Sequence, residues 1–172
     1  SGVHSVIHMA GSFIYGTNDG RFYFSELNDT AINPLSFETA ESNPDPGVRL
    51  FPYGDHFFYF GTKSIEIWYS TGQGDSGQPF ARMQGGTFPR GCAAKMTVAL
   101  CDNAATFVAD NGQVMQFTGT TPKQISVQAV ENDIQDAIAG GNKEAMEAFT
   151  WTQGGHEFYV LSAPDWTWVY DA

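Results

Sequence analysis

The sequence predicts an all-β fold of the β-propeller type, with about four blades of antiparallel sheet and one short helix. Two apolar runs, Phe57–Phe60 and Ile65–Tyr69, flank the polar group Gly61–Ser64, a pattern typical of a β-hairpin. Similar units recur with central turns at Asp19, Lys63, Asn111 and Pro164. The turns lie roughly 45–50 residues apart, a period typical of propeller blades with four strands each.

We expect a single propeller-like domain over residues 1–172, with blades near residues 1–42, 43–85, 86–127 and 142–172. The last blade is expected to be one strand short. A lone four-stranded sheet leaves both faces exposed, so such blades stack face to face around an axis. The sequence leaves open whether the four blades close on themselves or belong to a larger propeller. A β-sandwich or a pair of smaller β domains is the alternative fold.

The chain starts at Ser1 rather than Met and stops just after the strand-like segment Trp168–Tyr170. We therefore expect it to be an excised piece of a longer protein.

In the first two blades, alternating apolar residues and turn residues predict the strands. Asp19-Gly20 suits a tight hairpin because these residues accept the positive φ angles that such turns need. The predicted strands are Ser5–Met9, Ser12–Thr17, Arg21–Phe24, Leu35–Thr39, Val48–Tyr53, Phe57–Phe60, Ile65–Tyr69 and Phe80–Met83. Gly85-Gly86 is expected to break the chain after them.

The last two blades show the same alternation. Asn111-Gly112 and Gly154-Gly155 are predicted turns. The predicted strands are Lys95–Leu100, Ala105–Ala109, Gln113–Phe117, Lys123–Val127, Ala145–Thr152, Glu157–Leu161 and Trp166–Tyr170.

One helix is predicted between these blades. Its apolar stripe, at steps of three and four, is Val127, Val130, Ile134 and Ile138. Ser126 is expected to cap its start and Gly140-Gly141 to end it. We expect the helix to pack on the sheets, and the alternative is an insertion that docks a partner.

The composition excludes several classes of function. The chain has 8 Lys and Arg against 19 Asp and Glu, a formal net charge of −11. Direct DNA binding needs clustered Lys and Arg to replace counterions, so we expect none. The charge indicates solubility, or a surface that repels nucleic acid or meets a basic partner. No apolar run approaches the roughly 20 residues that span a bilayer, so we expect no membrane partner.

The two cysteines, Cys92 and Cys101, are expected to remain thiols. If one strand carried both, they would lie roughly 30 Å apart at about 3.3 Å per residue, beyond disulfide reach. Buried thiols fit a reducing compartment, although two of them are a weak indication.

The segment Gly74–Pro79 is similar to the nucleophile signature of trypsin-like serine proteases, with Gln78 where that family has a second glycine. His8, Asp55 and Ser76 have the right order for a triad, but no segment around the upstream histidines resembles that family. The same loop holds Gly72-x-Gly74-x-x-Gly77. A dinucleotide fingerprint would precede a helix, whereas Pro79 and an extended run follow here. We therefore expect a surface loop and no cofactor.

The histidines predict no metal site. His4 and His8 would share a strand face roughly 13 Å apart at about 3.3 Å per residue, too far for one metal ion. His56 and His156 occupy equivalent turns before aromatic strands, which favours a structural role.

Paired carboxylates of the kind that glycosidases use would have to come from Asp19, Asp55, Asp102 and Asp110. All four lie in predicted turns, where Asp is favoured for backbone reasons. We therefore predict no catalytic residues and no enzyme.

Three motifs stand in a recognisable order: Glu41-Ser42-Asn43-Pro44-Asp45, the run Phe60–Gly72 with its Phe-Gly-x-x-Ser-Ile-Glu core, and Gly91-Cys92. In this order the run from Glu41 to Gly112 resembles the packaged-DNA stabilisation proteins of short-tailed bacteriophages, which are tail adaptor or plug components. The helix after Ser126 and the closing Val169–Ala172 also fit the order of that family.

The resemblance implies a non-enzymatic virion protein of a phage or prophage, made in the bacterial cytoplasm and located in the phage tail. It implies a ring homo-oligomer of the parent protein below the portal, with portal and tail proteins as partners, that helps to retain packaged DNA. It carries over no catalytic, cofactor or metal residues. Because the net charge is −11, we expect retention through protein–protein contacts and no sequence-specific nucleic acid binding.

The alternative function is a carbohydrate-binding or glycoside-cleaving propeller. Exposed tryptophans near paired carboxylates would support it. The four tryptophans are Trp68, Trp151, Trp166 and Trp168. Alternating aromatic residues in strands are more often core residues, so we expect these side chains to be buried.

Overall fold

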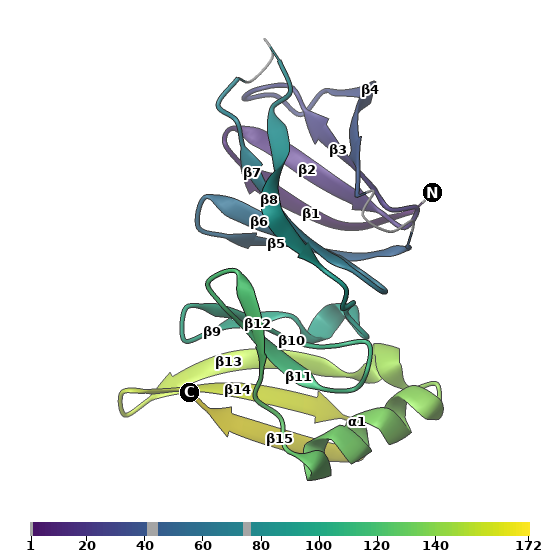
Figure 1. Ribbon diagram of the computed structural model, residues 1–172, viewed down its shortest axis with the longest axis vertical. Coiled ribbons are helices and arrows are strands. Elements are labelled where there is room, and N and C mark those ends of the chain that lie inside the picture. The colour runs from purple at the N-terminus through teal and green to yellow at the C-terminus, as the bar shows by residue number, and fades with distance from the viewer. Residues whose placement is uncertain (1, 41–44, 74–76) are drawn as a thin grey trace. The chain divides into compact units, whose positions relative to one another are not determined.

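The computed structural model describes residues 2–40, 45–73 and 77–172 (Figure 1). The chain divides into two compact units, Ser1–Gly91 (unit 1) and Cys92–Ala172 (unit 2). Each unit contains two antiparallel sheets, and unit 2 also contains the helix α1 (Gln128–Ala139). The predicted all-β class with one short helix is confirmed.

Unit 1 contains two four-stranded sheets with the orders β1-β2-β3-β4 and β5-β6-β7-β8. Each strand therefore pairs with its neighbours in sequence, as in a meander. The strands are β1 (Val3–Met9), β2 (Ser12–Thr17), β3 (Arg21–Ser25), β4 (Ile32–Thr39), β5 (Gly47–Tyr53), β6 (His56–Gly61), β7 (Ile65–Ser70) and β8 (Phe80–Phe88).

An aromatic core joins the two sheets of unit 1. Phe22 of β3 is 0% exposed, and its ring lies edge-on to Phe57 at 5.4 Å and to Trp68 at 4.9 Å between centroids. Such edge-to-face pairs add to the stabilisation from apolar burial. On β6 the alternate residues Phe58 and Phe60 point to the opposite face and are buried as well. Strand β6 is therefore apolar on both faces.

Unit 2 contains a four-stranded sheet, β12-β11-β10-β9, and a three-stranded sheet, β13-β14-β15. Its elements are η2 (Lys95–Thr97), β9 (Ala99–Cys101), β10 (Ala104–Val108), β11 (Val114–Thr118), β12 (Thr121–Gln124), α1, η3 (Lys143–Ala145), β13 (Glu147–Gln153), β14 (His156–Ala163) and β15 (Trp166–Asp171).

The core of unit 2 lies between its two sheets and the helix. Ile134 of α1 is fully buried in a cluster with Val114, Tyr159 and Leu161. Tyr159 donates a hydrogen bond from its hydroxyl to the Thr97 carbonyl at 2.7 Å. Figure 1 shows α1 beside the β13–β15 sheet, so the expectation that the helix packs on the sheets is confirmed.

The repeat predicted from the sequence matches the sheets. The central turns at Asp19, Lys63, Asn111 and Pro164 each join the second and third strands of their sheet. The predicted blades each coincide with one sheet, apart from the later end of β8, and the last sheet has three strands. Their union in one propeller-like domain remains a prediction.

Several strand boundaries were predicted wrongly: the strand predicted over Lys123–Val127 ends at Gln124, and Ala145 lies in η3 rather than in β13. For two further errors the structure shows the cause. Lys95–Leu100 begins as the 3-10 turn η2, because Thr97 donates its hydroxyl to the Ala94 carbonyl at 2.7 Å, and the strand starts only at Ala99. Strand β8 does not break at Gly85-Gly86. Gly85 takes a φ of 74°, and an irregularity in the β7–β8 register absorbs the extra residues.

The prediction that Ser126 caps the helix was also wrong. The N-cap is Val127, with extended backbone and no side-chain cap bond. The Ser126 hydroxyl instead donates to Glu131 at 2.7 Å and accepts the Val114 amide hydrogen at 3.0 Å. The glycine stop is confirmed, with Gly140 as C-cap and Gly141 at a φ of 76°. Among the residues that the structure describes, no helix has the length and hydropathy needed to cross a membrane.

The cysteines do not share one strand. Cys92 lies in an isolated bridge with Ala109, and Cys101 ends β9, with η2 between them. Both are buried thiols and form no disulfide, as expected.

The core of unit 1 yields a first prediction. We expect Phe22→Ala to lower the free energy of unfolding by about 3–5 kcal/mol, because it leaves a cavity between Phe57 and Trp68. Phe13→Ala, at a half-exposed position on the opposite face of the same sheet, should cost clearly less. Urea unfolding measured by tryptophan fluorescence checks both, and equal losses would contradict this packing.

Candidate functional site

The two described residues of the protease-like triad, His8 and Asp55, each contact another residue. His8 lies on the exposed face of β1, with its ring 5.1 Å from that of Phe13. The Asp55 carboxylate, which would orient His8, contacts His56 instead. Ser76 lies outside the described residues.

His4 and His8 do not share a face of β1, so that expectation was wrong. The β1–β2 register shifts between Val3 and Ser5, and this bulge turns His4 inward. His4 is buried, bonds Ser5 Oγ at 2.7 Å and lies 5.9 Å from the Tyr59 ring. Among the described residues, no group of three or more His, Cys, Asp or Glu side chains could hold a metal ion.

The four candidate glycosidase carboxylates lie in four different turns. Asp19 lies in the β2–β3 turn, and Asp55 in the β5–β6 turn at the other end of the strands. In unit 2, Asp102 precedes β10 and Asp110 follows it. Within each unit, therefore, the two candidate carboxylates do not face each other across a cleft.

The tryptophans differ from the expectation that all are core residues. Trp68 is buried, as predicted, and Trp166 is half-buried against the core of unit 2. Trp151 is 46% exposed on β13. Trp168 is exposed on β15 and donates its Nε1–H to Asp133 of α1 at 2.9 Å.

A buried carboxylate holds the turn in the motif that carries the family resemblance. Asp45 accepts hydrogen bonds from the Lys63 amide, from the Ser64 amide at 3.0 Å and from the Ser64 hydroxyl at 3.2 Å. These donors belong to the β6–β7 turn, which lies 18 residues later in the chain. Asp45 thus fixes the turn that follows Gly61, and we name this contact the Asp45 clasp.

Glycines make room for the clasp. A Cβ on Gly61 would lie 2.4 Å from an Asp45 carboxylate oxygen, and a Cβ on Gly91 would lie 2.1 Å from the Thr62 carbonyl. Real Cβ atoms do not approach so closely, so a side chain at either position would displace the turn. The remaining residues of the motif, Glu41–Pro44, lie outside the described residues.

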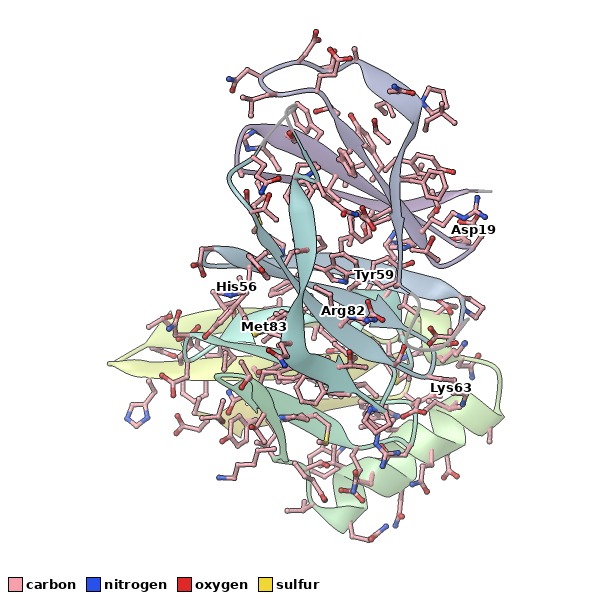
Figure 2. The ribbon with its side chains drawn as sticks, turned by 45° about the horizontal axis from the view of Figure 1, so that its top comes forward. Asp19, His56, Tyr59, Lys63, Arg82 and Met83 are labelled. Atoms are coloured by element: carbon pink, nitrogen blue, oxygen red, sulfur yellow. The ribbon has the colours of Figure 1, made fainter. Side chains whose placement is uncertain are left out.

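Tyr59 lies beside the clasp in the interior of unit 1 and donates its hydroxyl to the Thr17 carbonyl at 3.2 Å. Figure 2 shows Asp19, Tyr59 and Lys63 toward one end of the strands and His56 toward the other. Burial raises the pKa of Tyr59 well above its usual value, and the carboxylates of Asp45, Asp19 and Glu66 raise it further. The phenol therefore stays protonated and cannot serve as a general base at neutral pH.

Glu66 is a second buried carboxylate of the motif, 1% exposed in its side chain. It accepts the Trp68 Nε1–H at 2.9 Å and pairs with the Arg82 guanidinium at 3.3 Å. The ion pair with the arginine and the hydrogen bond from the indole offset the free-energy cost of removing this carboxylate from water. Like Asp45, it binds its own chain, so these motif residues are architectural.

Sequence reasoning missed both carboxylates as structural anchors. Asp45 stands between Pro44 and Pro46, which indicated only a loop. Glu66 shares a strand face with Trp68, and this alternation was the only signal that the two interact.

Each unit has a sheet face with exposed or half-exposed apolar side chains. On β1–β4 the open face, which we name the first face, carries half-exposed aromatic rings and one exposed valine. Val6, Tyr15, Tyr23 and Phe37 lie opposite one another in the register, and Phe13 lies two residues from Tyr15 on the same face.

On β13–β15 the open face, which we name the last face, is similarly apolar. Phe149, Trp151 and Val169 are 54%, 46% and 55% exposed. The register places them on one side of the sheet with Phe158 and Val160, and the rings of Trp151 and Phe158 lie 5.2 Å apart. Exposed apolar faces of this kind favour contact with other protein surfaces.

Comparison with known families assigns the chain. A family model described as Bacteriophage P22 Gp10, beta-propeller, matches residues 1–172. The chain belongs to this family. A search of curated proteins gives no match. The resemblance predicted from the sequence is confirmed, and so is the propeller-like class. The family is one of phage structural proteins, which supports a structural role for this chain.

The Asp45 clasp gives a second prediction. We expect Asp45→Ala to cost about 3 kcal/mol of unfolding free energy, because the buried Ser64 amide and the partly buried Lys63 amide lose a charged acceptor. Asp55→Ala, at an exposed turn carboxylate, should cost less than about 0.5 kcal/mol. Urea midpoints measure both losses, and a harmless Asp45→Ala would show that the clasp does not hold the turn.

The buried phenols give a third prediction, on pH. The pKa values of Tyr59 and Tyr159 are raised in the folded state, so the unfolded chain releases protons first as the pH passes about 10. Stability should therefore be fully present below that pH and fall above it, by up to about 1.4 kcal/mol per pH unit for each phenol.

Tyr59→Phe should be less stable than the wild type at pH 7 and should lose stability less steeply above pH 10. Tyr23→Phe, which removes a half-exposed hydroxyl, is the control. Urea midpoints from pH 7 to 11 decide the question, and equal slopes for Tyr59→Phe and the wild type would refute the prediction.

Proposed function

We propose that this chain is part of a virion tail adaptor or plug that helps to retain packaged DNA through protein–protein contacts. The observation that carries the proposal is membership of the phage structural family over residues 1–172. The protein would be made in the bacterial cytoplasm and assembled into the phage tail as a ring homo-oligomer, with portal and tail proteins as partners. It would act without catalysis.

The surface chemistry supports contacts with proteins rather than with DNA. The formal net charge is −11, and phosphate binding needs clustered cations. The first face and the last face offer apolar surface for protein contacts instead. An acidic wall facing a channel would repel the phosphate backbone, so DNA that leaves through it would not adhere.

Particle assembly tests this proposal. We expect the protein to copurify with portal and tail proteins in a pull-down, and filled heads assembled without it to lose their DNA. A protein that joins no virion component, or heads that keep their DNA without it, would overturn the proposal.

Direct DNA binding is a separate prediction. In a gel-shift assay at about 0.15 M salt we expect no shift of duplex DNA, because the chain lacks the cations that would displace counterions. A basic DNA-binding protein is the positive control. Appreciable binding would contradict retention by protein contacts alone.

A second candidate function, sugar binding, has one supporting observation. A hollow of about 220 Å³ in unit 2 is lined by Trp166 together with Asp133, Asp136 and Asp165. An aromatic ring beside carboxylates can bind a sugar through stacking and hydrogen bonds. A glycan array tests this function: binding that is lost in Asp165→Asn would support it, and an array without bound glycans would exclude it.

A further inference from the structure

Two hollows in unit 1 lie where its two sheets meet at their outer strands, β4 and β8. Each hollow has a volume of about 350 Å³. The first is lined by Ser36 of β4 and by Gly77, and the second by Glu38 of β4 and by Gln78. The two hollows therefore follow each other along both walls, and we name them together the seam groove. It belongs to the contact between the two sheets of unit 1 and is a different surface from the first face.

The two hollows share an aromatic floor and one polar bridge. Phe24 lines the first hollow and Phe80 the second, and their rings lie edge-on with centroids 5.7 Å apart. Gln78 donates a side-chain hydrogen bond to Glu38 and so links the two walls. Because this bond joins two exposed side chains, it can open without disturbing either strand.

Both walls of the seam groove are edge strands. β4 is the last strand of one four-stranded sheet, and β8 is the last strand of the other. An edge strand presents alternate backbone N–H and C=O groups on its unpaired side, and an extended peptide can pair with such groups. On β4, Ser36–Thr39 spans about 10 Å at about 3.4 Å per residue, which is the length of three or four residues of extended chain.

A buried hydroxyl in the first hollow has no partner. Ser12 is 5% exposed and lines this hollow. Its side chain forms no hydrogen bond with another residue in the part of the chain that the structure describes. A buried polar group without a partner costs free energy, so a polar group of a ligand would be bound favourably there.

The charges in the seam groove favour a basic ligand. Glu26 lines the first hollow and Glu38 the second. Arg82, labelled in Figure 2, also lines the second hollow, but its guanidinium pairs with the buried Glu66 at 3.3 Å. The positive charge of Arg82 is thus offset by Glu66, and the carboxylates of Glu26 and Glu38 set the sign of the groove.

We propose that the seam groove binds an extended segment of another protein that carries a lysine or an arginine. The carboxylates of Glu26 and Glu38 attract the basic side chain, and the edge strands and the Ser12 hydroxyl bind the backbone of the segment. The inference rests on the proposed function, in which portal and tail proteins are the partners, and it names the surface that one of them uses. So short a contact is weak by itself, and several copies in a ring would strengthen it through effective concentration.

Direct binding of peptides tests the inference. The probes are overlapping 15-residue peptides that cover the portal and tail proteins of the same phage, and fluorescence polarisation measures their binding to the whole chain. We expect at least one peptide with a lysine or an arginine to bind with a Kd below about 1 mM. Its binding should weaken as the salt concentration rises from about 0.05 M to about 0.5 M, because salt screens exposed charges. A set without any binding peptide would overturn the proposal.

Charge variants locate the binding site. Glu38→Lys should weaken binding of that peptide at least about tenfold, because it replaces attraction by repulsion. Glu38→Gln keeps an oxygen that accepts the bond from Gln78 and removes only the charge, so it should weaken binding about two- to fivefold. The matched control is Asp55→Lys, at an exposed carboxylate in the β5–β6 turn, which should leave the Kd unchanged. Equal losses in Glu38→Lys and Asp55→Lys would show a general attraction to an acidic protein and overturn the proposal.

A steric variant gives an independent readout. Ser36→Trp places an indole in the first hollow and should abolish binding, whereas Thr30→Trp, at an exposed position in the β3–β4 turn, should not. Circular dichroism and urea midpoints confirm that each variant is folded. Unchanged binding in Ser36→Trp would place the peptide elsewhere and refute the proposal.

The groove and the adaptor function can fail separately. Equal recovery of portal and tail proteins by the wild type and by Glu38→Lys in the pull-down would refute the groove and leave the adaptor function standing. Peptide binding that Glu38→Lys abolishes, together with a wild type that recovers no virion protein, would support the groove and refute the adaptor function.

Discussion

A short antiparallel sheet with aromatic residues on both faces must find another layer on each side. In unit 1 this constraint falls on β6, where Phe57 and Tyr59 lie in the core between the two sheets and Phe58 and Phe60 lie on the other face of the strand. Four strands are too few to shield such a surface alone, since aromatic burial supplies much of the stability of an all-β fold. The repetition of one hairpin pattern along the chain follows from this need.

The polar contacts inside unit 1 serve the same packing. The Asp45 clasp fixes the β6–β7 turn, and the Tyr59 hydroxyl reaches the backbone at Thr17, where the β2–β3 hairpin turns. The Asp45 carboxylate and the Tyr59 hydroxyl are both satisfied by the chain itself, which avoids the cost of an uncompensated buried donor or acceptor. The residues that identify the family in the sequence thus hold hairpins in place, and this explains why they suggest no chemistry.

The sequence predicted what depends on local periodicity. Alternation located the strands, turn residues located the hairpins, and the steps of three and four around Ile134 located α1. The errors arose where something other than local periodicity decided the outcome. A bulge in β1 turns His4 inward, and Ser126 forms hydrogen bonds with Val114 and Glu131 instead of capping α1. The positive φ of Gly85 allows β8 to continue. The open faces could not be predicted, because alternation shows that Trp151 and Val169 share a side but not whether another layer covers it.

The state of Cys92 and Cys101 has a consequence for how the protein responds to oxidation. Neither is in a disulfide, both are shielded from solvent, and burial together with nearby carboxylates raises the pKa of Cys101 to about 11. A thiol that is neither ionised nor accessible reacts slowly with oxidants. The protein should therefore keep the same covalent structure in a reducing and in an oxidising medium. Its free energy of unfolding should then be the same in both.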